Sequence, residues 1–139
     1  MNGISDGCAV KRMPPSLDAW LSEAKADENA AKCGMYLSHN GVVRADAKGS
    51  VREGKADTPP VRGMLFSFDA EKVSAAEAET RKLPGIYYVR TWLNEGELSV
   101  GDDLMYVLIG GDIRPRVEDA LQFLVGKLKN ECVAETERF

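Results

Sequence analysis

GELSVGDDLMYVLIGG, residues 96–111, is the stretch of sequence that decides the fold class. Residues 97–100 form a short strand-like segment, and the glycine and two aspartates at 101–103 are typical of a turn. Leu104 to Ile109 is the most apolar run of the chain, which indicates a strand at the centre of a sheet. The stretch therefore predicts two strands joined by a turn, with the second strand central.

The sequence on either side of this stretch predicts three helices and three more strands. Ser16 and Asp69 stand where helix N-caps are expected, and Pro115 stands where a first helical residue is favoured. The predicted helices cover residues 16–28, 69–82 and 115–130, and the further strands cover residues 33–43, 61–68 and 86–93. Because the strands cluster between few helices, we expect an α+β fold with a mainly antiparallel sheet and flanking helices.

Length and composition fit one globular domain. The chain has 139 residues, of which 44% are hydrophobic and 29% are charged, so it can bury a core without disulfide bonds. We expect a loose leader at residues 1–15 and a single domain at residues 16–139. The last nine residues are mostly polar, and we expect them to project from the domain.

Charge and cysteine content exclude several classes of function. The 18 Lys and Arg residues face 22 Asp and Glu residues, a net charge of −4, whereas nucleic-acid binders usually have a basic surplus. Cys8, Cys33 and Cys132 form no C-x-x-C pair, which argues against a zinc site and fits thiols in a reducing cytosol. No apolar run approaches the ~18 residues of a membrane span, and no signal-peptide pattern opens the chain. We therefore expect a cytoplasmic protein.

A basic loop is the first candidate site. Between residues 44 and 60 there is no apolar periodicity, and Arg44, Lys48, Arg52 and Lys55 concentrate positive charge in an acidic protein. Cationic side chains beside glycines suit an anionic small molecule such as a phosphate ester. We expect the loop to be mobile when free and ordered around an anion. The alternative is a solvated loop that its charge keeps soluble.

Lys129 is the second candidate. Val117, Leu121, Leu124 and Leu128 form one apolar stripe on the last predicted helix, and Lys129 borders that stripe. A lysine in such a place can lose hydration and act as a nucleophile or as an acid or base. The alternative is that its side chain extends to solvent and favours the C-terminal end of the helix dipole.

A search for familiar catalytic and metal motifs finds none. His39 is the only histidine, and without an H-x-x-x-H pattern we interpret it as structural or exposed and not as a metal ligand. The sequence contains no G-x-S-x-G, Walker or G-x-G-x-x-G motif. Nothing specific therefore supports a hydrolase, a P-loop nucleotide binder or a dinucleotide enzyme.

Three motifs, in order along the chain, resemble those of one known family. GVVR, residues 41–44, resembles the G-x-V-R of the molybdopterin synthase large subunit, the MoaE family. GELSVGDDLMYV, residues 96–107, is similar to that family's G-E-L-x-x-G-(D/E) turn and following strand. ALQFLVGKLK, residues 120–129, is similar to its A-x-x-F-x-x-x-x-L-K helix. The resemblance covers residues 17–138 and implies a MoaE-like domain of the α/β-hammerhead type.

The resemblance implies a sulfur-transfer function. The family converts a cyclic pyranopterin monophosphate into the dithiolene of molybdopterin, and a small ubiquitin-like partner of the MoaD type delivers sulfur as a C-terminal thiocarboxylate. By resemblance Lys129 is the catalytic lysine, and Arg44 and Arg114 bind anionic groups of the substrate. Arg52 and Lys48 of the basic loop are expected to bind substrate too. The family also implies a homodimer, a heterotetramer with the partner, and no cofactor or metal.

The sequence departs from the family at positions that leave alternatives open. The family's second functional lysine lies in a W-K-x-E segment, where this chain has Ala134, Glu135, Thr136 and Glu137 and no lysine. A His-Arg pair before the last helix is Ile113 and Arg114 here. The alternative to an active synthase is a non-catalytic MoaE-like dimer with a binding or scaffold role. A third possibility is an unrelated α+β domain whose basic loop binds another phosphorylated metabolite.

Overall fold

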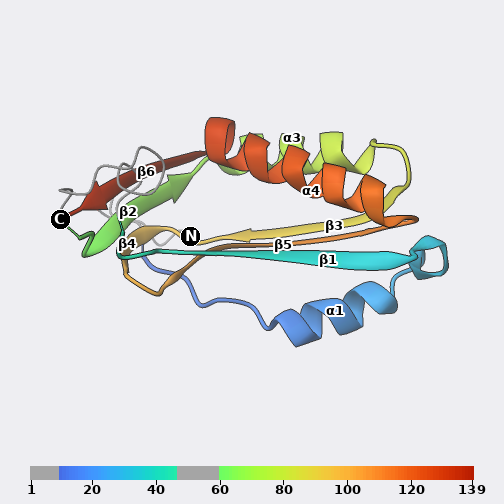
Figure 1. The fold of residues 1–139 in the computed structure, drawn as a ribbon, viewed down its shortest axis with the longest axis horizontal. Coiled ribbons are helices and arrows are strands. Elements are labelled where there is room, and N and C mark those ends of the chain that lie inside the picture. The colour runs from blue at the N-terminus through green and yellow to red at the C-terminus, as the bar shows by residue number, and fades with distance from the viewer. Residues whose placement is uncertain (1–9, 47–59) are drawn as a thin grey trace.

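The computed structural model describes residues 10–46 and 60–139, which form three α-helices and six strands (Figure 1). The helices are α1 (Leu17–Lys25), α3 (Ala70–Arg81) and α4 (Arg114–Lys127), with a short 3₁₀ helix at Ala30–Lys32 and a π-helical turn at Leu128–Cys132. The strands are β1 (Met35–Val42), β2 (Gly63–Phe68), β3 (Ile86–Leu93), β4 (Gly96–Ser99), β5 (Asp103–Gly111) and β6 (Val133–Arg138). These elements confirm the predicted α+β fold.

The strands form two antiparallel sheets. β1, β5 and β3 make one sheet in that order, and β4, β2 and β6 make the other. Every strand pair in the described residues is antiparallel. α3 and α4 cover one face of the β1-β5-β3 sheet, and α1 lies on the opposite face (Figure 1). The prediction of mainly antiparallel pairing is therefore confirmed, with the strands divided between two sheets.

β5 is the central strand of its sheet, as its apolar sequence predicts. Val107 and Ile109 are fully buried in the core that includes residues of α3 and α4. Leu108, on the other face, packs against Trp20 and Ala24 of α1. Burial of each large apolar side chain stabilises the fold by ~1.5–3 kcal/mol. β5 therefore holds the helices on both faces to the sheet.

The helices begin at the predicted caps. The side chains of Ser16 and Asp69 accept hydrogen bonds from backbone N–H groups in the first turns of α1 and α3. α4 has its proline in the first turn and ends at Lys127. The next five residues form the π turn, closed by a hydrogen bond from the N–H of Val133 to the carbonyl of Leu128. The helix predicted over 115–130 is thus regular only to residue 127.

The expectation that the last nine residues project is wrong. Residues Val133–Arg138 form β6, which pairs with β2 so that Phe68 lies opposite Val133 and Gly63 lies opposite Arg138. Backbone groups make the hydrogen bonds of a strand ladder, so polar side chains do not prevent pairing. The C-terminal segment is therefore part of the second sheet.

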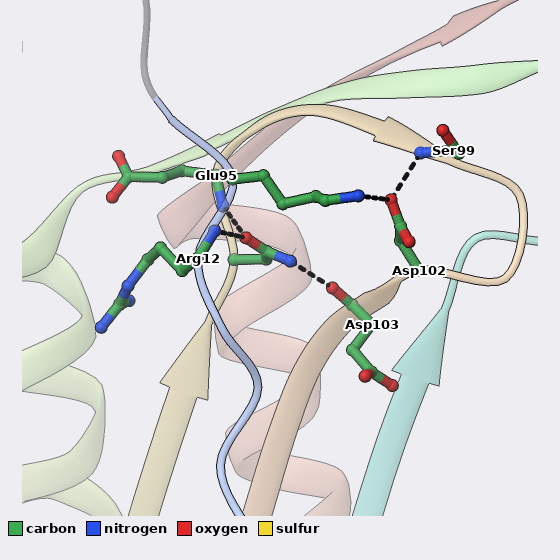
Figure 2. A network of polar contacts seen from close by, with 7 residues as sticks. Arg12, Glu95, Ser99, Asp102 and Asp103 are labelled. Atoms are coloured by element: carbon green, nitrogen blue, oxygen red, sulfur yellow. Dashed lines mark hydrogen bonds and ion pairs between the residues drawn. The ribbon is translucent and has the colours of Figure 1, made fainter.

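Residues 10–15 form neither a helix nor a strand. Two residues of this segment, Lys11 and Arg12, make polar contacts that attach it to the domain (Figure 2). The backbone N–H of Arg12 donates to Oδ1 of the buried Asn94 at 2.7 Å. Nζ of Lys11 lies 2.8 Å from Oδ2 of Asp102. The described part of the predicted leader is therefore held at the connection between β3 and β4 by Arg12 and at the turn between β4 and β5 by Lys11.

We expect Leu128→Ala to lower the free energy of unfolding by ~2–5 kcal/mol, because it removes a fully buried side chain and leaves a cavity. Urea denaturation measures this value. Leu121→Ala is the matched control, since Leu121 lies on the same stripe but is only partly buried. Equal losses in the two variants would contradict the anchoring role of Leu128.

Candidate functional site

A cavity of about 200 Å³ lies where the end of β1 approaches the π turn and β6. Its lining mixes cations, carboxylates, one histidine and a few apolar side chains. The lining residues are His39, Gly41, Val42, Arg44, Met64, Leu104, Lys129, Glu135 and Glu137. The fold thus brings together residues from the first third of the chain and from its C-terminal end.

Arg44 reaches the cavity because the backbone around it is fixed. The register of β1 against β5 shifts at residues 41–42, just before the strand ends. The N–H of the buried Val43 then donates to the carbonyl of Asp102 at 2.9 Å, which ties the chain to the turn between β4 and β5. Nε of Arg44 donates to the carbonyl of Asp46 at 3.1 Å. Arg44 is exposed, and this hydrogen bond holds one edge of its guanidinium.

Lys129 reaches the cavity because α4 changes into a π turn. It is the second residue of this turn, directly after the buried Leu128, and its side chain is exposed. π turns add a residue to a helical turn and frequently occur at functional sites. The expected place of Lys129 beside the apolar stripe assumed a regular α-helix to residue 130, but the residue lies in the π turn and its side chain borders the cavity.

Two carboxylates complete the charged lining. Glu135 and Glu137 are half-buried and face the cavity, whereas Thr136 between them is exposed. This follows from the alternation of successive side chains between the two faces of a strand. Sequence reasoning missed both glutamates because it did not predict β6.

His39 lies on the cavity side of β1. Burial lowers the pKa of His39, and the positive charge of Lys129 lowers it further. Its Nε2 atom is buried and has no hydrogen-bond partner among the described residues. The imidazole is therefore neutral at neutral pH, beside an ammonium group. The sequence interpreted this residue only as structural or exposed, because a single histidine without a metal pattern carries no further signal.

Two of the predicted site residues meet in this cavity, and a third lies elsewhere. Arg44 and Lys129 both line the cavity. Arg114 is the first residue of α4 and is exposed. The 14 residues of α4 span about 20 Å, at ~1.5 Å per residue, so Arg114 lies a full helix length from Lys129. Arg114 is therefore not part of this cavity within one chain.

Lys48 and Arg52 lie outside the described residues, within 47–59. Most of the basic loop 44–60, with its predicted mobility and ordering around an anion, falls in the same range. These predictions therefore stay predictions.

Another cavity, between α3 and the π turn, contains charges that are already paired. Nζ of Lys127 lies 3.5 Å from the carboxylate of Glu131 and 3.6 Å from that of Glu79. The negative charge of Glu131, and to a smaller extent that of Glu79, raises the pKa of Lys127. Burial raises the pKa of the Cys132 thiol in the same cavity, so it is not a thiolate nucleophile at neutral pH. Lys127, Glu79 and Glu131 of this lining are thus already paired with one another.

Residues 10–46 and 60–139 contain no group of three or more His, Cys, Asp and Glu side chains that could hold a metal ion. Within the same residues, no helix has the length and apolar character needed to cross a bilayer.

We expect the cavity with Arg44 and Lys129 to bind sulfate, a simple dianion. Arg44→Ala and Lys129→Ala should each weaken binding about tenfold or more, since hydrogen bonds to charged groups contribute ~1.5–3 kcal/mol. Isothermal titration calorimetry measures the affinities. The matched control is Arg116→Ala, which removes the same charge from an exposed site on α4, where Arg116 pairs with Asp112 at 2.8 Å. A loss in the control as large as in the two cavity variants would contradict this location.

No family model matches the sequence, and no curated protein matches it either. Solved structures do match its fold. Molybdopterin synthase from Staphylococcus aureus matches with a TM-score of 0.71 and 14% identity, over 95% of this chain and 90% of that chain. The MoaE protein from Burkholderia ambifaria matches with a TM-score of 0.67 and 19% identity, over 91% and 84%. A complex of subunits 1 and 2 of molybdopterin-converting factor from Helicobacter pylori matches with a TM-score of 0.62 and 14% identity, over 87% and 74%. This chain therefore has the fold of the MoaE proteins.

Proposed function

We propose that this chain is a MoaE-type subunit that acts in molybdopterin biosynthesis in the cytoplasm. In this role it accepts the thiocarboxylated C-terminus of a small ubiquitin-like partner and transfers sulfur to a cyclic pyranopterin monophosphate. The observation that carries the proposal is that Arg44 and Lys129, far apart in sequence, line one cavity in a MoaE fold. Because the chain has the fold of the MoaE proteins, nothing supports the third possibility, an unrelated α+β domain that binds another phosphorylated metabolite.

Arg44 and Lys129 have the chemistry that this reaction needs. The guanidinium of Arg44 can bind a phosphate group through two parallel hydrogen bonds. The ammonium of Lys129 can stabilise the negative charge that develops during sulfur attack, or transfer a proton to the departing group. The partner supplies the sulfur, so the reaction requires no nucleophilic cysteine of this chain.

A second copy of the chain and a small partner complete the proposed assembly. The cavity of about 200 Å³ is smaller than the ~300–1,000 Å³ of typical small-molecule sites, so we propose that the site extends across a homodimer. In such a dimer the exposed Arg114 of the second copy provides the further substrate-binding cation. The Helicobacter pylori structure is a complex of two subunits, which supports a small second subunit here and hence a heterotetramer.

The carboxylates of the cavity favour a second candidate function, a non-catalytic MoaE-like protein. Where the family has a second lysine, β6 presents Glu135 and Glu137 to the cavity and Thr136 to the outside. Among the described lining residues, two carboxylates stand beside two cations without a surplus of positive charge, which weakens the attraction of these groups for an anionic substrate. In this alternative, the chain keeps the dimer and binds a partner or a pterin without turnover.

Lys129→Ala should abolish sulfur transfer, with a loss of about 10²-fold or more, because it removes the group that stabilises developing charge. The assay combines the chain with a thiocarboxylated MoaD-type partner and cyclic pyranopterin monophosphate, and measures molybdopterin formation. Lys127→Ala is the matched control, since Lys127 pairs with Glu79 and Glu131 away from the cavity. A wild-type chain that binds the partner but makes no product would establish the non-catalytic alternative.

A lysine added on the cavity face of β6 should increase activity, whereas one added on the outer face should not. We expect Glu135→Lys or Glu137→Lys to raise turnover about fivefold, the effect of ~1 kcal/mol. Thr136→Lys, with the same new charge on the exposed face, should leave turnover close to wild type. The same assay measures all three variants, and thermal denaturation checks their folding. The highest turnover in Thr136→Lys would contradict the proposed role of the cavity face.

A further inference from the structure

His39 borders the cavity without any polar partner. It lies on β1 two residues before Gly41, and both line the cavity with Arg44 and Lys129. The backbone of Gly41 lies beside the imidazole, since a Cβ at this position would be in van der Waals contact with Nε2 of His39, at 3.8 Å. Nε2 itself is buried and lacks a hydrogen-bond partner among the described residues. The described residues therefore provide no acceptor at Nε2 that would stabilise an additional proton on this ring.

In the part of the chain that the structure describes, charged groups line the cavity beside His39 from three segments. They are Arg44 after β1, Lys129 of the π turn, and Glu135 and Glu137 of β6. β2 and β5 add only the apolar side chains of Met64 and Leu104 to the lining. Burial and the charge of Lys129 lower the pKa of His39 even with the two carboxylates present. The ring is therefore neutral while the cavity is empty.

We propose that His39 takes up a proton when a dianion binds between Arg44 and Lys129, so that the occupied cavity has a third positive charge. The proton passes from solvent to the unprotonated ring nitrogen, and no covalent bond to the ligand forms or breaks. An anion beside an imidazolium favours the charged form of the ring, as any opposite charge within ~4–6 Å does. The inference rests on the anion site of the proposed function but does not require sulfur transfer.

Proton uptake by His39 makes the affinity for the anion depend on pH, and the direction follows from the two pKa values of His39, without and with the anion. The pKa of His39 is low in the empty cavity and higher in the complex. Between these two values, binding consumes a proton, so the affinity for the dianion increases as the pH falls. Linkage is reciprocal, so each unit by which the anion raises this pKa corresponds to about a tenfold gain in affinity across the window.

The test uses NMR of the imidazole, because His39 is the only histidine of the chain. The untagged protein is titrated from about pH 5 to pH 8, the range in which histidine changes charge, in saturating sulfate or in chloride of equal ionic strength. Sulfate keeps its double charge over this range, and the ring signals report His39 itself and not the carboxylates of β6. We expect sulfate to raise the titration midpoint by about one unit or more.

Two variants make the test specific. Lys129→Met should raise the midpoint in chloride, since the repelling charge is gone, and should reduce the change that sulfate causes. Lys127→Met, which removes a lysine outside the cavity, should leave both midpoints unchanged. Sulfate binding by calorimetry without a change in the midpoint would overturn the proton uptake and leave the anion site intact. Absence of sulfate binding would overturn both this inference and the anion site of the proposed function.

Discussion

Burial of Leu128 at the point where α4 becomes a π turn is the constraint on which the site depends. Leu128 is fully buried, and its carbonyl accepts the hydrogen bond from Val133 that closes the turn. The carbonyl of Cys132 accepts a second bond from the N–H of Asp69, the N-cap of α3, at 2.8 Å. The chain therefore leaves the core in one direction only, into β6. The direction in which the π turn leads into β6 therefore determines where Lys129 and the cavity face of β6 lie.

The charge balance of the cavity explains why two functions compete. The whole chain is acidic, with a net charge of −4, yet the cavity combines the cations of Arg44 and Lys129 with the carboxylates of Glu135 and Glu137. A neutral His39 adds no attraction for an anion until it gains a proton. An active synthase needs enough positive charge to hold a phosphorylated substrate, and the proposed proton on His39 adds to the charges of Arg44 and Lys129.

Sequence reasoning predicted the elements whose signals are local and missed those that depend on pairing. The apolar run of β5 and the caps at Ser16 and Asp69 identify a central strand and two helix starts, because burial and capping act on neighbouring residues. β6 has no such signal, since its polar residues pair through the backbone with a strand about 70 residues away. The basic loop and the apolar stripe identified Arg44 and Lys129 as candidates, and the motif resemblance assigned their roles, whereas the positions of His39, Glu135 and Glu137 at the cavity required coordinates. The helix repeat of 3.6 could not reveal the π turn, which a buried leucine and the following strand determine together.

The central claim is that Arg44 and Lys129 form one anion site within a single chain. The most direct measurement is a crystal structure of the protein soaked with selenate, a heavier analogue of sulfate, with the anion located by its anomalous scattering. The account predicts a peak in the cavity, within hydrogen-bond distance of the Arg44 guanidinium and the Lys129 ammonium. Ordered selenate elsewhere on the chain, with an empty cavity between these two side chains, would contradict it.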